Sequence, residues 1–313
     1  MNRTPPKNVR EKLRQEVGFG CPIDECSNPY LQWHHFDPPW RIKNHHNPEG
    51  MIALCPAHHG KADAGAYTPN QLRAYKKNKV QSQKIKGKFD WLRNDLLVVI
   101  GGMFYYKTLS PLKINNKNVV WFNRDAEGYF RLNIELLSRL PEERLIIEDN
   151  IWTNIGNPCD VHSPPNGKEL RVAYSNGDYI EIKFTELNDS DAALKIYGHD
   201  PVESMNQQYN KFKDIMDSLK FSSFQHIPKY PITSVEINLT VADTDIKLTP
   251  KGKVCNTSMK NCKFTGENNG LSINIDTIFR QNPSLLPYMP QSRLELCPCG
   301  SGQRFKHCHG KFI

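Results

Sequence analysis

The forty-three residues from Cys21 to Asp63 constrain the fold of this 313-residue chain more than any other stretch. They contain three of its nine cysteines and six of its eleven histidines. Thiolates and imidazoles are the ligands that zinc prefers in proteins. This density of ligand residues predicts a metal-binding module near the N-terminus.

Two short-spaced pairs, Cys21-x4-Cys26 and Cys55-x2-His58, are separated by an insertion of twenty-eight residues. A tetrahedral zinc site is commonly assembled from two such pairs. We therefore predict one structural zinc held by three thiolates and one imidazole.

A second set of ligands is predicted on the segment Pro56 to Asp63, which should form a short helix because proline suits the first helical turn and Gly65 suits its end. Neighbouring helical residues diverge by about 100°. His58 and His59 are therefore expected to face different sites. His59 and Asp63 are four residues apart and share one face, so they are predicted ligands of a second metal.

The doublet His34-His35 lies in an aromatic-rich segment, Tyr30 to Phe36, that is bounded by prolines and predicts a strand. One imidazole of this doublet is expected to complete the second metal site. The other, unligated and with a pKa near neutrality, is the candidate general base.

Residues 15 to 65 resemble the HNH, or ββα-metal, endonucleases in their zinc-stabilised form. The resemblance implies that His34 joins His59 and Asp63 at the catalytic metal and that His35 activates water. One position departs from the family, because Gly50 stands where a middle asparagine is usual, and Asn47 could replace it only in a rearranged loop. The four-residue spacing of the helix ligands is similar to that of the colicin DNases.

Two other interpretations of the ligand cluster stay open. A Cys/His cluster can be a purely structural zinc module, although a His doublet and a His-x3-Asp pair remain after four ligands are assigned. Two histidines and a carboxylate can also hold iron in oxygenases. His45 and His46 have no partner spacing and are expected to be solvated or to face phosphate.

Positive charge is concentrated in the same part of the chain. Residues 1 to 94 contain sixteen Lys and Arg against eight Asp and Glu, whereas residues 95 to 313 contain twenty-five of each. A basic region around a metal site favours a polyanionic partner, most simply DNA. The candidate phosphate contacts, each of which could instead be simply solvated, are Arg41, Lys43, Lys61, Arg73, Lys76 and Lys77. The last three lie on a basic helix expected from Thr68 to about Lys86.

Residues 95 to 290 have a different character, with short β-rich runs and one long helix. Asn176-Gly177 between two such runs predicts a hairpin. Alternating apolar residues from Val235 to Val241 predict a half-buried strand. Asp200 and Glu203 form a capping box before an apolar stripe, which predicts the long helix. No catalytic motif occurs here, so this region is expected to bind or regulate.

The C-terminal segment contains Cys297-x-Cys299, eight further residues, and then Cys308-His309. This spacing resembles the SEC-C motif found at the end of the bacterial translocase motor SecA and in many unrelated proteins. The resemblance implies a second structural zinc on these four residues and a role in docking a protein partner. Zinc binding would contribute on the order of 10 kcal/mol to the folding of so short a segment.

The sequence thus predicts an α+β protein with a nuclease domain at 1–66, a basic helix or linker at 67–94, a β-rich domain at 95–290 and a zinc knuckle at 295–313. The predicted function is a metal-dependent DNA endonuclease that uses Mg, Mn, Ni or Zn. The alternatives are a non-catalytic zinc-stabilised adaptor that binds nucleic acid or protein, and a ribonuclease. The chain has no apolar run of eighteen residues, and its cysteines have metal-ligand spacings, so we expect a cytoplasmic protein without a membrane partner.

Overall fold

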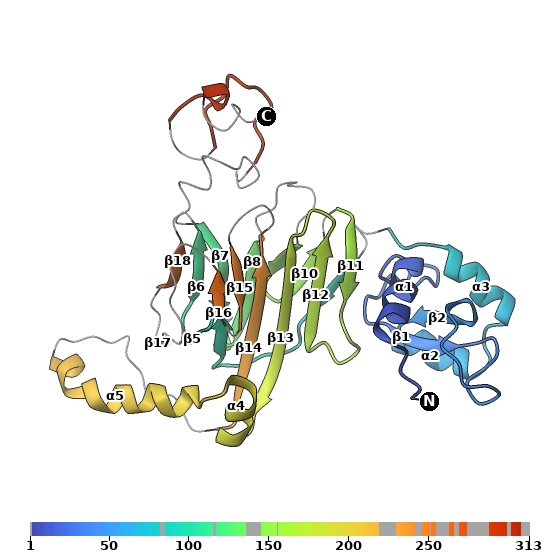
Figure 1. Ribbon diagram of the computed structural model, residues 1–313, viewed down its shortest axis with the longest axis horizontal. Coiled ribbons are helices and arrows are strands. Elements are labelled where there is room, and N and C mark those ends of the chain that lie inside the picture. Colours follow the sequence, from blue (N-terminus) through green and yellow to red (C-terminus); the bar gives the residue numbers. More distant parts are fainter. Residues whose placement is uncertain are drawn as a thin grey trace.

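The computed structural model describes residues 2–81, 85–114, 117–135, 145–154, 156–218, 230–241, 246–250, 252–254, 263–265, 269–273, 288–298 and 302–307. This part of the chain is mixed α+β and rich in strands, as predicted. A small N-terminal module, a β-rich body and a short C-terminal segment follow one another along the chain (Figure 1).

The N-terminal module places two strands among three helices. Its elements are α1 (Lys7–Val17), β1 (Gln32–His35), the 3-10 turn η1 (Pro48–Gly50), β2 (Met51–Leu54), α2 (Pro56–Asp63) and α3 (Pro69–Lys77). β1 and β2 pair antiparallel, with His34 opposite Ile52. Leu13 and Val17 of α1 pack with Leu72 of α3 on the apolar residues of β2, and this small core holds the module together.

The basic helix ends earlier than its sequence predicts. α3 stops at Lys77, and the amide of Val80 then donates to the carbonyl of Val17. Strand β3 (Lys86–Lys88) already belongs to the β-rich body. Ile85 and Phe89 on either side of it are fully buried, and this burial of apolar surface stabilises the pairing of the strand with the body.

The β-rich body consists of two sheets. The seven-stranded sheet contains, in spatial order, β18 (Asn269–Ile273), β6 (Ser110–Ile114), β7 (Lys117–Arg124), β8 (Phe130–Glu135), β9 (Leu145–Glu148), β10 (Ile151–Asn154) and β3. The nine-stranded sheet contains β11 (Pro158–His162), β12 (Glu169–Tyr174), β13 (Tyr179–Leu187), β14 (Ile232–Thr240), β4 (Leu97–Ile100), β5 (Met103–Tyr106) and β17 (Lys263–Thr265), with β15 (Lys247–Thr249) and β16 (Gly252–Val254) attached beside β14.

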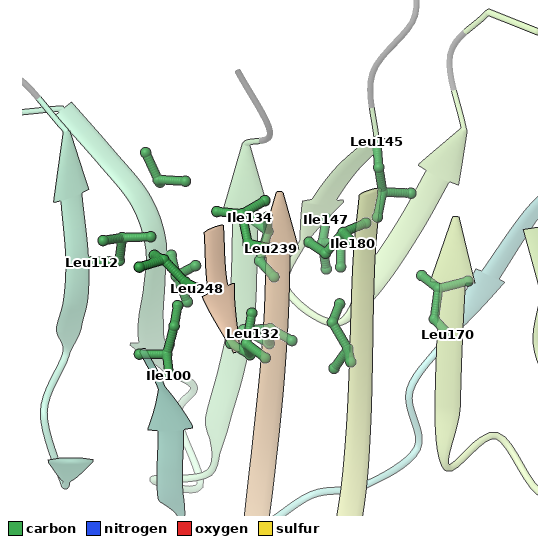
Figure 2. Close-up of a cluster of buried hydrophobic side chains, with 14 of the residues drawn as sticks. Ile100, Leu112, Leu132, Ile134, Leu145, Ile147, Leu170, Ile180, Leu239 and Leu248 are labelled. Atoms are coloured by element: carbon green, nitrogen blue, oxygen red, sulfur yellow. The ribbon is translucent and has the colours of Figure 1, made fainter. Parts of the chain in front are cut away.

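The two sheets pack face to face over a common apolar core. Figure 2 shows Leu132 and Ile147 of the seven-stranded sheet among Ile180 and Leu239 of the other sheet. The predicted alternation holds in β14, where Ile237 and Leu239 are fully buried between half-buried polar residues. The hairpin predicted at Asn176-Gly177 is confirmed by the antiparallel pairing of β12 and β13.

α4 (Ser190–Tyr197) and the first turns of α5 (Pro201–Ser218) pack against the outer face of the nine-stranded sheet. Val202 and Met205 of α5 are buried against this face, together with Leu97 and Val99 of β4. β4 is thus buried on both sides, which explains its continuous apolar sequence.

The N-terminal module docks at one end of the body and touches both sheets there. The Arg14 guanidinium of α1 makes two hydrogen bonds, of 2.9 and 2.8 Å, to the Asp160 carboxylate of the edge strand β11. The Tyr30 hydroxyl donates to the carbonyl of Lys88 in the other edge strand, β3. The module therefore covers sheet edges that would otherwise be open to another chain.

No helix in the described ranges has the length and hydrophobicity that a bilayer-spanning segment requires.

Candidate metal centres of the N-terminal module

The four residues of the predicted structural zinc site come together. Cys21 and Cys26 lie in the loop after α1, Cys55 precedes α2, and His58 lies in its first turn. The Nδ1 atom of His58 is 3.4 Å from the sulfur of Cys21 and 3.3 Å from that of Cys55, and the sulfurs of Cys26 and Cys55 are 3.8 Å apart. Tetrahedral zinc separates two thiolates by about 3.8 Å and a thiolate from an imidazole nitrogen by about 3.6 Å. The cluster has the dimensions of a zinc site.

The protonation chemistry of this cluster points the same way. Burial raises the pKa of the Cys21 and Cys26 thiols, and for Cys26 the neighbouring Cys55 adds to the rise. Three thiols packed together ionise readily only around a cation. Burial lowers the pKa of His58, which favours the neutral imidazole that a metal requires.

A second group of ligand atoms forms where β1 meets α2. The Nδ1 atom of His34 is 3.2 Å from one carboxylate oxygen of Asp63, and the Nδ1 atom of His59 is 3.2 Å from the other. One ligand atom from each of the three residues lies within 4.8 Å of the others. Because His58 and His59 are adjacent on α2, the helix contributes one imidazole to each cluster.

Two details suit this group to a cation. The Nε2 atom of His59 is 3.3 Å from the carbonyl of Trp33, which can hold the proton there and leave Nδ1 as the free ligand atom. The Nδ1 atom of His34 is buried and has no hydrogen-bond partner in the described structure, although Asp63 is close. A metal would satisfy that atom and both carboxylate oxygens at once.

His35 points to the other side of β1, as strand alternation requires. Its ring lies 4.7 Å from that of Trp40 and 5.2 Å from that of His45, measured between centroids. Both ring nitrogens are buried without a hydrogen-bond partner in the described residues. Burial, followed by the charges of His45, His46 and Arg3, lowers the pKa of His35 to about 4, which differs from the near-neutral value that the sequence suggested.

The loop beside His35 accounts for Gly50. A Cβ atom at this position would lie 1.8 Å from the carbonyl oxygen of Asp37, so no asparagine fits. Asn47 does not replace it, since its side chain caps η1 by accepting from the amide of Glu49. His45 spans the loop instead: its Nε2 lies 2.8 Å from the carbonyl of Pro38, and its Nδ1 accepts from the amide of Asn47.

A hollow of about 460 Å³ opens beside the second group. It is lined by His34, His35 and Asp63, and by two arginines, Arg3 and Arg41. Asp63 is half exposed at this opening, whereas His34 is buried. The sequence indicated Arg41 but gave no sign of Arg3, which reaches the hollow from the segment before α1.

The other predicted phosphate contacts are arranged less simply. Lys43 and Lys61 are exposed but do not line the hollow beside the second group, and Lys77 lines a separate groove. Arg73 pairs with Asp37, and Lys76 pairs with Glu16 at 3.0 Å and with the carbonyl of Pro48. These two cations connect α3 to the loop and to α1. The sequence predicted them as phosphate contacts and did not predict this structural role.

At the C-terminal end, Leu296 and Arg304 form an antiparallel bridge, and the amide of Cys297 donates to the carbonyl of Gln303. The turn η4 (Phe305–His307) follows. Cys297 is buried in this tight segment. The other predicted ligands, Cys299, Cys308 and His309, lie outside the described residues.

Comparison with family models matches the end of the chain. Residues 295–311 are a SEC-C motif. This confirms the C-terminal resemblance, whereas no HNH family model matches the N-terminal module.

Among curated proteins, the chain is similar to the translocase subunit SecA. The SecA of Blochmanniella pennsylvanica is 26% identical over 222 residues, which are 65% of this chain and 23% of that protein. The SecA of Rickettsia africae is 31% identical over 129 residues, or 38% of this chain and 14% of that protein. The chain thus spans less than a quarter of these relatives. No solved structure matches it.

Proposed function

We propose that the N-terminal module is the catalytic part of a metal-dependent endonuclease of the HNH type, acting on DNA. The observation that carries the proposal is the convergence of His34, His59 and Asp63 at one hollow that His35 also lines. A purely structural zinc module has no use for this second group of ligands.

His34, His59 and Asp63 would hold the catalytic metal, and the two helix residues fix its position relative to β1. When bound, such a metal supplies positive charge that stabilises the extra negative charge of a phosphodiester under attack. Two imidazoles and one carboxylate suit Zn, Ni or Mn, and also Mg with added waters, so the ligands do not select among them.

His35 would take the proton of the attacking water. Its low pKa keeps the imidazole unprotonated and ready to accept, and a phosphodiester anion beside it would favour the protonated form and raise that pKa during the reaction. Arg3 and Arg41, which line the same hollow, would hold the phosphate by charge-assisted hydrogen bonds.

The Cys21, Cys26, Cys55 and His58 cluster would hold a structural zinc that fixes the start of α2 and thereby the position of His59. A reducing, cytoplasmic setting would keep these thiols available for the metal. A second structural zinc would be held by the SEC-C segment through Cys297, Cys299, Cys308 and His309, and this segment would dock a protein partner.

The second candidate function is a non-catalytic adaptor that binds nucleic acid or protein. It is favoured by the deep burial of His35, only 3% exposed, and by the SEC-C motif at the other end of the chain. In the endonuclease His35 accepts a proton from water, whereas in the adaptor it only packs against its neighbours.

The deciding experiment is nicking of supercoiled plasmid by the purified full chain with Mg, Mn, Ni or Zn, beside the His35→Ala variant. We expect the substitution to reduce cleavage at least about a hundredfold, as loss of a general base does. The zinc content should stay unchanged, because His35 is in neither cluster.

The matched control pair is Asp63→Asn and Asp90→Asn. Asp63→Asn removes a ligand charge and should abolish cleavage, whereas Asp90 is exposed and distant in sequence, so its substitution should have no effect. An RNA substrate tested in parallel decides between a DNase and an RNase. Absence of cleavage with every metal and both substrates, with salt-sensitive binding retained, would establish the adaptor.

A further inference from the structure

A second pocket, of about 250 Å³, is lined by residues of α1, β11 and β12. Figure 1 shows α1 next to β11 at one end of the β-rich body. The pocket is separate from the metal hollow and shares no lining residue with it. Its lining is almost entirely charged, and consists of Lys7, Arg10, Arg14, His162, Glu169 and Arg171. Neither the N-terminal module nor the β-rich body forms this pocket alone.

Cations outnumber carboxylates around this pocket. Asp160 pairs with the Arg14 guanidinium at 2.8 Å and also lies 3.5 Å from that of Arg171, so one carboxylate serves two arginines. Glu169 lies 3.9 Å from the ring of His162. Lys7 has a carboxylate of its own helix, Glu11, at 3.8 Å. The four cations therefore face three carboxylates in all.

Arg10 is the cation without a counterpart. Its Nε atom is buried and has no hydrogen-bond partner within the described ranges, and no carboxylate is paired with it there. A buried guanidinium N–H without an acceptor is costly, and an oxyanion would satisfy it. Arginine binds phosphate and carboxylate particularly well because its donors form a planar fork.

The electrostatic state of His162 reflects the same excess of charge. Burial, followed by Arg14, Arg171 and Arg10, lowers the pKa of His162 to about 3. Two of these arginines lie on α1 and one on β12, so positive potential converges on the pocket from both sides.

We propose that this pocket binds a phosphate group, held between Arg10 of α1 and Arg171 of β12. Bound there, the anion would tie the N-terminal module to the β-rich body. The group could belong to a small phosphorylated molecule or to a nucleic-acid backbone. Both present anionic phosphoryl oxygens to the arginines, the first as a phosphomonoester of one or two negative charges and the second as a singly charged phosphodiester. The proposal does not depend on the endonuclease assignment.

The test is isothermal titration of the zinc-loaded full chain, in chloride buffer without added Mg, Mn or Ni, with inorganic phosphate, adenosine monophosphate and a ten-residue oligothymidine. Arg10→Gln should weaken binding at least about tenfold, since a hydrogen bond to a charged group is lost. Lys12→Gln is the matched control: it removes the same charge from α1 on the side facing Glu49, and should change affinity less than twofold.

A third variant should change the affinity for phosphate in the opposite direction. Glu169→Gln removes a negative charge from the pocket and should tighten binding. Binding of phosphate or of the mononucleotide that depends on Arg10 identifies a small-ligand site, and binding of the oligothymidine alone with the same dependence identifies a backbone contact. Equal affinities of the Arg10→Gln and Lys12→Gln proteins for all three probes would overturn the proposal. Because no cleavage is measured, this result is independent of the nuclease assay.

Discussion

At the scale of single residues, the N-terminal module uses neighbouring side chains for different purposes. His58 and His59 point in different directions from α2, and His34 and His35 point to opposite sides of β1. The two doublets therefore contribute to the four-residue Cys/His cluster, to the second group of ligands and to the packing around His45. His45 adds a further function. Its hydrogen bond to the carbonyl of Pro38 holds the loop between the strands, next to Gly50, where a side chain would clash with the Asp37 carbonyl.

His45 should therefore act as a positioning residue for His35 if the module is the proposed nuclease. In His45→Phe, the ring contact with His35 is kept while the hydrogen bonds to Pro38 and Asn47 are lost. We expect kcat for plasmid nicking to fall roughly tenfold or more with KM and zinc content nearly unchanged, because a displaced base slows chemistry without weakening binding. His45→Gln, which keeps a donor and an acceptor, should restore part of the rate. Equal kcat values for both variants and the parent protein would rule the role out.

Among helices and strands, the sequence predicted those features that short-range interactions determine, namely helix ends and a tight turn. Pro56 after Cys55 and the end near Gly65 predicted α2 with its observed bounds, and Asn176-Gly177 predicted the β12–β13 turn. The end of α3 could not be predicted in this way, because the basic pattern continues past Lys77. The contacts that follow the helix, from the Val80 amide to the Val17 carbonyl and from buried Ile85 and Phe89 to the body, join residues far apart in the sequence. Arg3 reaches the metal hollow through a contact distant in sequence, and no spacing encodes it.

The predicted cap of α5 gives a test at this scale. One carboxylate oxygen of Asp200 accepts from the amides of Val202 and Glu203 and from the hydroxyl of Tyr230, at 2.9, 3.0 and 2.7 Å. Asp200→Ala should lower the free energy of unfolding by about 1 to 2 kcal/mol, as loss of a helix cap does. Urea denaturation at pH 7 measures the change. Asp214→Ala, on an exposed position of the same helix, should change it by less than about 0.5 kcal/mol.

The cap should also be sensitive to acid. Burial opposes the ionised form of Asp200, but the hydrogen bonds from Tyr230, Ser190 and two backbone amides outweigh burial and lower its pKa. A lowered carboxyl pKa stabilises the fold above the ordinary value of about 4, and that contribution is lost as the pH falls through the folded-state pKa. The difference between the parent protein and Asp200→Ala should accordingly shrink below about pH 4. A difference that stays constant down to pH 3 would contradict this account.

At the scale of the whole molecule, the junction between the module and the body is held by charge as much as by apolar packing. Arg14 is almost fully buried at this junction against Asp160, and His162 lies beside it. Facing His162 are Arg10 and Arg14 of α1 and Arg171 and Glu169 of β12. Protonation of His162 would add a further positive charge among three arginines.

The junction should therefore weaken in mild acid. The pKa of His162 is lowered to about 3 in the folded protein, mainly by burial, whereas an unfolded histidine titrates near its ordinary value of about 6.5. As the pH falls below about 6.5, the unfolded chain takes up a proton that the folded chain does not, and stability is lost, by at most about 1.4 kcal/mol per pH unit for one group. Replacing the histidine by a side chain that does not titrate removes this contribution.

We expect His162→Gln to show a shallower loss of unfolding free energy between pH 6.5 and pH 5 than the parent protein, with His307→Gln as the same substitution at an exposed position. Other buried histidines, including His35, titrate in all three proteins, so only the difference between their slopes reports on position 162. Parallel slopes for the parent protein and His162→Gln would show that the pKa of His162 is not lowered in the folded protein. A shallower slope for His162→Gln alone would show that the acid sensitivity of the protein arises at the same junction where we propose that phosphate binds.

Added phosphate should then raise the unfolding free energy of the parent protein in this pH range more than that of Arg10→Gln, because the bound anion offsets the same positive charge.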